Sequence, residues 1–108
     1  MPRHDLQGNL DLVVLKTLAQ RGRLHGYGIV LHIHSESDEL LQVEEGSLYP
    51  ALHRMEQSGW INSEWALTET GRRAKYYRLT AAGRKQLNEA EASFERLVKG
   101  VRAMLRYA

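Results

Sequence analysis

Residues 45–61 read EGSLYPALHRMEQSGWI, and residues 72–78 read RRAKYYR. The first stretch predicts a helix, because its apolar residues recur at the spacing of a single helix face: Leu48, Ala51, Leu52 and Met55. Ser47 is a suitable N-cap for this helix, Pro50 fits its first turn, and Gly59 is typical of a helix end.

The opposite face of this helix is free for a partner, and it carries Tyr49, Pro50, His53, Arg54 and Gln57. Beyond the helix, residues 61–67 and 74–79 have the alternation of two β-strands, joined through residues 68–71 into a cationic hairpin. A polar helix edge can enter a DNA groove, and cations on a neighbouring hairpin can reach phosphates. The two stretches together predict a winged helix-turn-helix that binds double-stranded DNA.

Charge is small overall but unevenly distributed. The net charge is +2, yet residues 71–85 hold six cations and no acid, and residues 36–45 hold five acids and no cation. Because the local distribution sets the field that a partner meets, the sequence predicts one basic and one acidic surface. Beside a helix-turn-helix pattern, the basic run favours DNA contact over a merely solvated face.

Two further helices are predicted before this region. Residues 10–20 form a helix, ended by Gly22, whose apolar residues cover roughly 260° of its circumference. Such a wide arc predicts contact with the chain's own core on one side and with a second subunit on the other, through Leu10 and Val14. The second helix spans residues 26–35 with Tyr27, Val30 and Ile33 facing inward, and residues 40–43 form a short extended segment.

A long final helix follows Thr80, its expected N-cap. Its apolar residues are spaced as a heptad seam, which Val98 and Leu105 widen: Leu87, Ala90, Phe94, Leu97, Val101 and Met104. At 1.5 Å per residue this seam is about 39 Å long, more than the small domain can cover. We therefore expect a homodimer, the alternative being a helix that folds back on its own domain.

The predicted fold class is α+β, mainly α: a winged helix-turn-helix domain over residues 1–80 and a long C-terminal dimerisation helix over residues 81–108. The chain has no cysteine, no apolar run of membrane-spanning length and no signal-peptide pattern at its start. These features predict a soluble cytoplasmic protein that contacts no membrane.

Other chemistry finds little support in the sequence. His32 and His34 lie about 200° apart on a helix and cannot bind one metal ion. Gly26 and Gly28 lack the third glycine and the preceding strand of a dinucleotide site. No cysteine nucleophile is present and no serine, histidine and carboxylate are expected to meet, so neither an enzyme nor a cofactor is predicted.

The chain resembles the PadR family of bacterial transcriptional regulators from about Leu10 to Leu87. The resemblance is carried by Leu10-Asp11-Leu12 with Leu15, His25-Gly26-Tyr27-Gly28, residues 45–52, Gly59-Trp60-Ile61, and residues 75–80 followed by Gly83. Five elements in this order are specific, although the Leu-Thr-x-x-Gly pattern alone occurs in several winged-helix families. The single C-terminal helix is similar to that of the smaller subfamily.

This resemblance implies a homodimeric repressor of a palindromic operator near its own gene. It places Ser47, Tyr49, Pro50, His53 and Arg54 on the groove-facing helix, and Arg72, Arg73 and Lys75 on the wing. Some members bind planar apolar drugs between the subunits, against a tryptophan of the last helix. Phe94 occupies a similar position here and is the implied effector contact, although its heptad spacing also suits a core residue.

Several residues have more than one expected role. Arg54 suits a bidentate contact with guanine, while Tyr49 and His53 suit either DNA or packing against loops. Only one of Tyr76 and Tyr77 can face the core, because neighbouring strand residues point oppositely; Trp60 and Trp65 are expected in the core or a hinge. The alternative function is a winged-helix protein-interaction module without specific DNA binding.

Overall fold

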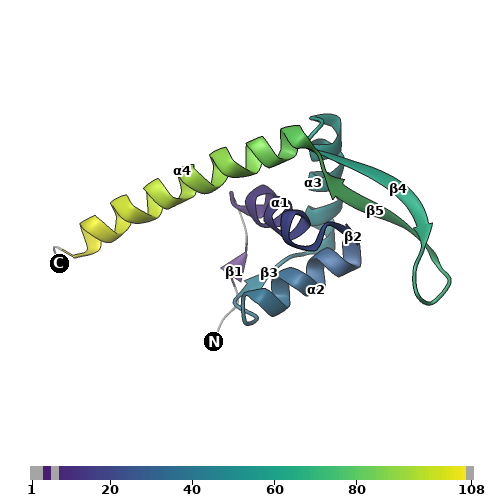
Figure 1. The fold of residues 1–108 in the computed structure, drawn as a ribbon. Coiled ribbons are helices and arrows are strands. Elements are labelled where there is room, and N and C mark those ends of the chain that lie inside the picture. Colours follow the sequence, from purple (N-terminus) through teal and green to yellow (C-terminus); the bar gives the residue numbers. More distant parts are fainter. Residues whose placement is uncertain (1–3, 6–7, 107–108) are drawn as a thin grey trace.

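The computed structural model describes residues 4–5 and 8–106 (Figure 1). Its elements in chain order are β1 (His4–Asp5), α1 (Leu10–Arg21), β2 (Arg23–His25), α2 (Gly26–Glu36), β3 (Leu41–Gln42), α3 (Glu45–Gln57), β4 (Ile61–Leu67), β5 (Arg73–Leu79) and α4 (Ala81–Leu105). The β4–β5 hairpin, which we call the wing, and the far end of α4 project from the body in opposite directions (Figure 1). The mainly helical α+β class is confirmed.

Helix α1 is at the centre of the body, in contact with β2, α2, α3, α4 and β5. Its apolar residues Val14, Leu15 and Leu18 are buried, and the buried Thr17 hydroxyl donates to the Val13 carbonyl at 2.7 Å. The wide apolar arc is therefore covered mainly by the chain itself. The expectation that Val14 meets a second subunit is wrong, since Val14 is 0% exposed, whereas Leu10 is only half-buried.

Helix α3 begins three residues earlier than predicted. Glu44 is the N-cap without a side-chain cap, and its carbonyl accepts from the Ser47 and Leu48 N–H groups at 3.0 and 2.9 Å. Ser47 thus lies inside the first turn, and Pro50 lies in the second. Two features make this start possible. Glu45 adds a favourable negative charge to the first turn. Pro50 has no N–H to donate to the Gly46 carbonyl, but Gly46 is exposed, so water can satisfy that carbonyl.

The predicted end of α3 at Gly59 is confirmed. Gly59 has φ of 80°, a conformation open to glycine at little cost. Its N–H donates to the Glu56 carbonyl, and the Trp60 N–H donates to the Met55 carbonyl, both at 3.0 Å. These two bonds satisfy carbonyls at the helix end and turn the chain directly into β4.

A three-stranded antiparallel sheet, in the order β2-β5-β4, supports the wing. The strands β4 and β5 were predicted, but β2 was not; it pairs with the base of β5, with Leu24 opposite Tyr77. A second unpredicted strand, β1, pairs in parallel with β3. Both missed strands are only two or three residues long and depend on partners distant in the sequence.

The two faces of the sheet differ, which resolves the roles of its aromatic residues. Tyr77 is buried in the core, while Tyr76 lies on the other face with its ring 5.2 Å from that of His25. Trp60 packs against the core as predicted. Trp65 is 60% exposed, so the core position among its two expected roles is wrong, and Tyr27 of α2, which was expected to face inward, is also exposed. Trp65 lies beyond the body on the wing, where no helix covers it.

Helix α4 begins as predicted, with the Thr80 hydroxyl accepting from the Gly83 N–H at 3.0 Å. Leu87 is buried in the chain's own core, so this seam position is not available to a partner. Farther along, exposed fractions are 61% for Leu97, 47% for Val101 and 77% for Met104. Within the described residues, no helix is both long and apolar enough to cross a bilayer.

Candidate DNA-binding surface

One side of α3 is exposed and carries the predicted groove-facing residues. We call it the outer edge of α3, and it consists of Ser47, Tyr49, Pro50, His53 and Arg54. The buried residues of the same helix are those predicted from its spacing: Leu48, Ala51, Leu52 and Met55. The core therefore holds α3 by one face and leaves the other available to a groove.

Tyr49 joins the two helices of the helix-turn-helix. Its hydroxyl oxygen lies only 2.6 Å from the position that a Cβ atom would have on Gly26, the first residue of α2. Only glycine leaves room for the tyrosine ring so close to the α2 backbone. Tyr49 thus packs against α2 while remaining about half exposed, so it can hold the two helices together and still meet a partner.

Arg54 is held by Asp11 of α1. Its two terminal nitrogens donate to the two carboxylate oxygens, at 2.7 Å for Nη1 and 2.8 Å for Nη2. Hydrogen bonding to Asp11, followed by the Asp11 charge, raises the pKa of Arg54, so the group is a fixed cation. The residue predicted to read guanine therefore already has a bidentate partner within the chain.

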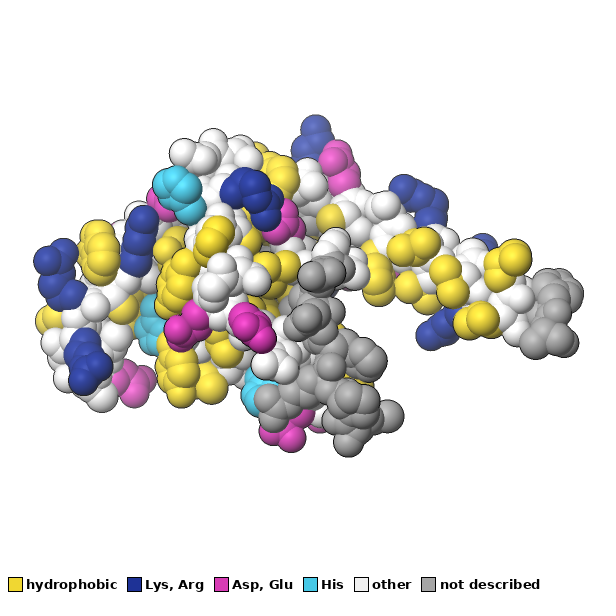
Figure 2. Space-filling model, turned by 180° about the vertical axis from the view of Figure 1, so that it is seen from behind, with side chains coloured by type: hydrophobic (Ala, Val, Ile, Leu, Met, Phe, Trp, Pro, Cys, Tyr) yellow, Lys and Arg dark blue, Asp and Glu magenta, His cyan; other side chains and the backbone are white. Residues whose placement is uncertain are grey.

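The three predicted wing cations have different surroundings. Arg72 is exposed beside the turn, where its N–H donates to the Thr68 hydroxyl at 3.2 Å. The Arg73 guanidinium lies 5.2 Å from the centre of the Trp65 ring, and the Lys75 ammonium lies 3.4 Å from Glu56 of α3. The ion pair brings the wing against α3. In the space-filling view, Lys and Arg side chains gather on the projecting hairpin (Figure 2).

Glu56 connects α3 with both wing strands. It accepts from the Ser63 hydroxyl of β4 at 2.6 Å and pairs with Lys75 of β5. The Ser63 hydrogen bond is the largest cause that lowers the pKa of Glu56, burial opposes it, and the Lys75 charge lowers the pKa further. The ionised carboxylate thus holds the wing at a defined position beside α3.

Replacing Ser63 with alanine is expected to raise the pKa of Glu56 toward its ordinary value of 4.5. A carboxylate with a lowered pKa stabilises the fold above its unfolded pKa, and this contribution is lost as pH falls through the folded pKa. Ser63→Ala should therefore unfold more easily than wild type at neutral pH, with the difference shrinking in acid.

Carboxyl NMR titration would measure the pKa of Glu56, and thermal unfolding at about pH 7 and pH 3 would measure the stability difference. Ser93→Ala is the matched control, because Ser93 is exposed on α4 and none of the side-chain hydrogen bonds found among the described residues involves it. An unchanged Glu56 pKa in Ser63→Ala would contradict the assigned role of the serine.

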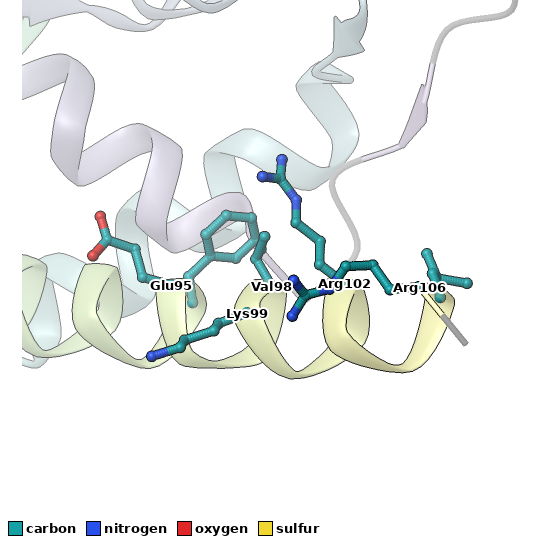
Figure 3. A pocket seen from close by; sticks show the side chains of 7 residues that line it. Glu95, Val98, Lys99, Arg102 and Arg106 are labelled. Carbon is teal, nitrogen blue, oxygen red and sulfur yellow. The ribbon is translucent and has the colours of Figure 1, made fainter. Parts of the chain in front are cut away.

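A separate groove of about 720 Å³ runs along α4 and contains the predicted effector contact, Phe94. Its lining is apolar at Phe94, Val98 and Leu105 and charged at its border: Glu95, Lys99, Arg102 and Arg106. Figure 3 shows the labelled residues along one side of the helix. In the part of the chain that the structure describes, no three His, Cys, Asp or Glu side chains are grouped to hold a metal ion.

Sequence reasoning missed two acids that organise this surface, Asp11 and Glu56. Both acids lie in predicted helices. Along the sequence, however, Asp11 is 43 residues from its partner Arg54, and Glu56 is 19 residues from its partner Lys75. The apolar periodicity that locates a helix does not report which charged groups meet across helices. The uneven distribution of charge drew attention to the basic run, and Asp11 was noted only as part of the Leu10-Asp11-Leu12 motif, so neither acid was given a role.

The helix-turn-helix, the free outer edge of α3 and the cationic wing define the winged-helix class of DNA-binding domains. The chain matches the Transcriptional regulator PadR-like family over residues 14–89. A solved transcriptional regulator from Clostridium thermocellum is similar in structure, with a TM-score of 0.81, 33% identity, and coverage of 91% of this chain and 94% of that one.

The chain is also similar to three curated relatives. The chain is 31% identical over 90 residues to Uncharacterized protein X of Lysinibacillus sphaericus, covering 82% of each. It is 42% identical over 60 residues to Transcriptional regulator Rv3488 of Mycobacterium tuberculosis, covering 56% of this chain and 55% of that one. Over 72 residues it is 26% identical to Negative transcriptional regulator PadR of Bacillus subtilis, covering 67% and 40% respectively.

The chain therefore belongs to the PadR-like family of transcriptional regulators, as the sequence predicted. Members of this family are regulators and not enzymes, which agrees with the absence of a predicted catalytic group.

Proposed function

We propose that this protein is a homodimeric repressor that binds a palindromic operator and acts in the cytoplasm. The observation that carries the proposal is the position of the cationic wing beside the outer edge of α3, joined by the Lys75–Glu56 ion pair. A helix in the major groove and cations at the flanking phosphates would then engage one half-site. The name of the B. subtilis relative, a negative regulator, supports repression.

Dimerisation is proposed through the seam residues that the single chain leaves exposed. These are Phe94, Leu97, Val101, Met104 and Leu105, with the partly buried Ala90 and Val98 beside them and Leu10 from α1. An exposed apolar stripe on a helix that extends beyond the body favours a second copy as its cover. Residues up to 80 would then bind DNA. Residues 81–108 would hold the α3 helices of the two subunits, which we call the reading helices, about 34 Å apart.

The decisive experiment is a titration of the promoter region of the protein's own gene against a random duplex at physiological salt. We expect tighter binding of the promoter, with a preference of at least about a thousandfold. Equal affinity for the two duplexes would contradict the proposal and favour a protein-interaction module. The same titration with each half of any inverted repeat removed would test the palindrome.

Replacing Arg72 and Arg73 with alanine is expected to weaken binding to both duplexes and to make it less dependent on salt. Each lost phosphate contact reduces the log-log salt slope by about 0.9, so four contacts per dimer reduce it by roughly 3.6. Fluorescence anisotropy across a salt series would measure this slope. Replacing Arg96 with alanine on the exposed side of α4 removes a cation outside this surface and should leave the slope unchanged.

An effector is the second part of the proposal, and its supporting observation is the groove along α4. Phe94 and Val98 offer an apolar wall at the position where the family resemblance places a drug contact. We propose that a small apolar molecule bound there would relieve repression. Planar dyes that lose binding in a Phe94→Ala variant would support this site, and binding that persists unchanged would exclude Phe94 from it.

A further inference from the structure

Arg54 lies at one margin of the outer edge of α3. The buried face of the helix is centred near Leu48 and Met55, and at 100° per residue Arg54 projects toward one side of the exposed arc. On that side it meets Asp11 in the first turn of α1. Glu56 projects from the other margin and meets Lys75 of the wing. Helix α3 is therefore tied laterally on both sides, to α1 and to β5.

The geometry of the Arg54–Asp11 pair is that of a strong positioning contact. Two parallel hydrogen bonds of 2.7 and 2.8 Å fix the plane of the guanidinium as well as its distance from α1. Asp11 is itself well placed, because a negative charge in the first turn of α1 interacts favourably with the helix dipole. The core already holds the buried face of α3, and the two-bond fork adds a lateral contact that also fixes the orientation of the guanidinium.

The two hydrogen bonds to Asp11 draw the Arg54 guanidinium toward α1 and away from the centre of the exposed arc of α3. The central exposed positions of α3, Pro50, His53 and Gln57, are not among the ion-paired residues found in the described part of the chain. These positions can enter a groove while the lateral pair stays closed.

We infer that Asp11 is a positioning residue for DNA recognition: through Arg54 it sets the orientation of α3, and Arg54 acts within this pair without touching a base. The inference rests on the proposed DNA-binding function and deepens it. It moves Arg54 from the residues that read DNA to those that hold the reading helix. It also gives α1 a part in specificity although α1 lies outside the helix-turn-helix.

A charge exchange separates this role from direct contact. Asp11→Asn and Arg54→Ala are each expected to lower promoter affinity about five- to twentyfold, with random-duplex affinity and salt slope changed little, because no phosphate contact is lost. The exchanged pair, Asp11→Arg with Arg54→Asp, restores the link between α1 and α3 with reversed charges. It should recover at least part of the lost preference for the promoter, although an aspartate at position 54 would repel DNA if it faced the groove.

Glu89→Gln provides the matched control for Asp11→Asn, because it removes the same charge from an exposed position on α4. Circular dichroism melts would verify that each variant is folded. The inference is overturned if Asp11→Asn tightens binding to both duplexes and steepens the slope by about 0.9 per subunit, since Arg54 would then be a phosphate contact held back by Asp11. It is also overturned if the exchanged pair binds more weakly than either single variant.

The wild-type protein in the same experiment tests the proposed function separately. A wild type without preference for its promoter would overturn the proposed function and this inference together. The inference alone would be overturned if the wild type prefers its promoter but Asp11→Asn tightens binding to both duplexes, or the exchanged pair binds more weakly than either single variant.

Discussion

Replacing Leu97 with glutamate is expected to convert the protein from a dimer to a monomer and to abolish preferential binding to its promoter. Leu97 is 61% exposed in the single chain, so its replacement removes little from the chain's own core. At a helix seam between two copies, the same change would bury an unpaired carboxylate from each subunit. Such burial weakens association by more than about a hundredfold.

The affinity for the promoter should fall by more than the loss of the contacts at one half-site would explain. Two linked reading helices bind with an effective concentration that raises affinity by about 10² to 10⁴ over a single one. Sedimentation at about 10 µM and anisotropy with the promoter duplex would measure the two effects, which should appear together because one depends on the other.

Ala92→Glu is the matched control, because it adds the same charge at an exposed position of α4 outside the seam. It should remain a dimer and bind the promoter with nearly wild-type affinity. A Leu97→Glu protein that sediments as a dimer and keeps its promoter preference would show that α4 is covered in some other way. Unfolding of the monomer is distinguished by circular dichroism, since the winged-helix core does not contain Leu97.

The sequence predicted those parts of the fold that depend on local periodicity. The face of α3, the end of that helix at Gly59, the hairpin and the Thr80 cap each follow from residues within one or two turns of one another. The start of α3 did not follow from Ser47, because an extended Glu44 whose carbonyl accepts the first helical hydrogen bonds can begin a helix without a side-chain cap. Several polar residues near the start of a helix can act as its N-cap, and only the tertiary path of the chain determines which of them does.

The parts that were not predicted depend on contacts between distant residues. Strand β2 has three residues and exists only because β5, about 50 residues later, offers an edge beside it. The central position of α1 likewise results from packing on five elements, and no property of α1 alone distinguishes those neighbours from a second subunit. The same limit applies to Asp11 and Arg54, which determine how the candidate surface is held together.

Replacing Gly83 with alanine is expected to destabilise the protein by several kcal/mol, one of the largest effects available from adding a single carbon. A Cβ atom at this position would lie 1.9 Å from the Trp60 carbonyl oxygen and 2.8 Å from its carbonyl carbon. Because both are backbone atoms, no side-chain rotation can relieve the overlap. The Trp60 carbonyl also accepts from the Thr80 N–H at 3.0 Å, so it cannot withdraw without losing that bond.

The consequence reaches beyond the local clash, because Gly83 lies where α4 joins the corner between α3 and β4. The Thr80 hydroxyl donates to the Gly59 carbonyl at 2.6 Å and accepts from the Gly83 N–H, so the start of α4 is fixed to the end of the reading helix. Moving α4 outward to admit a methyl group would shift the proposed dimer helix relative to α3. A Gly83→Ala protein that still folds is therefore expected to bind the promoter poorly.

Replacing Gly100 with alanine, on the same helix, is expected to change the stability in the opposite direction. Gly100 is exposed in α4, and apart from its two chain neighbours and the backbone of its own helix, no atom of the described residues lies within 4 Å of a Cβ built there. Without a clash, the higher helix propensity of alanine should stabilise the protein by about 0.5–1 kcal/mol. Thermal and urea unfolding of the two variants should therefore move in opposite directions from wild type. Equal or same-sign shifts would show that close packing at Gly83 does not join α4 to the reading helix.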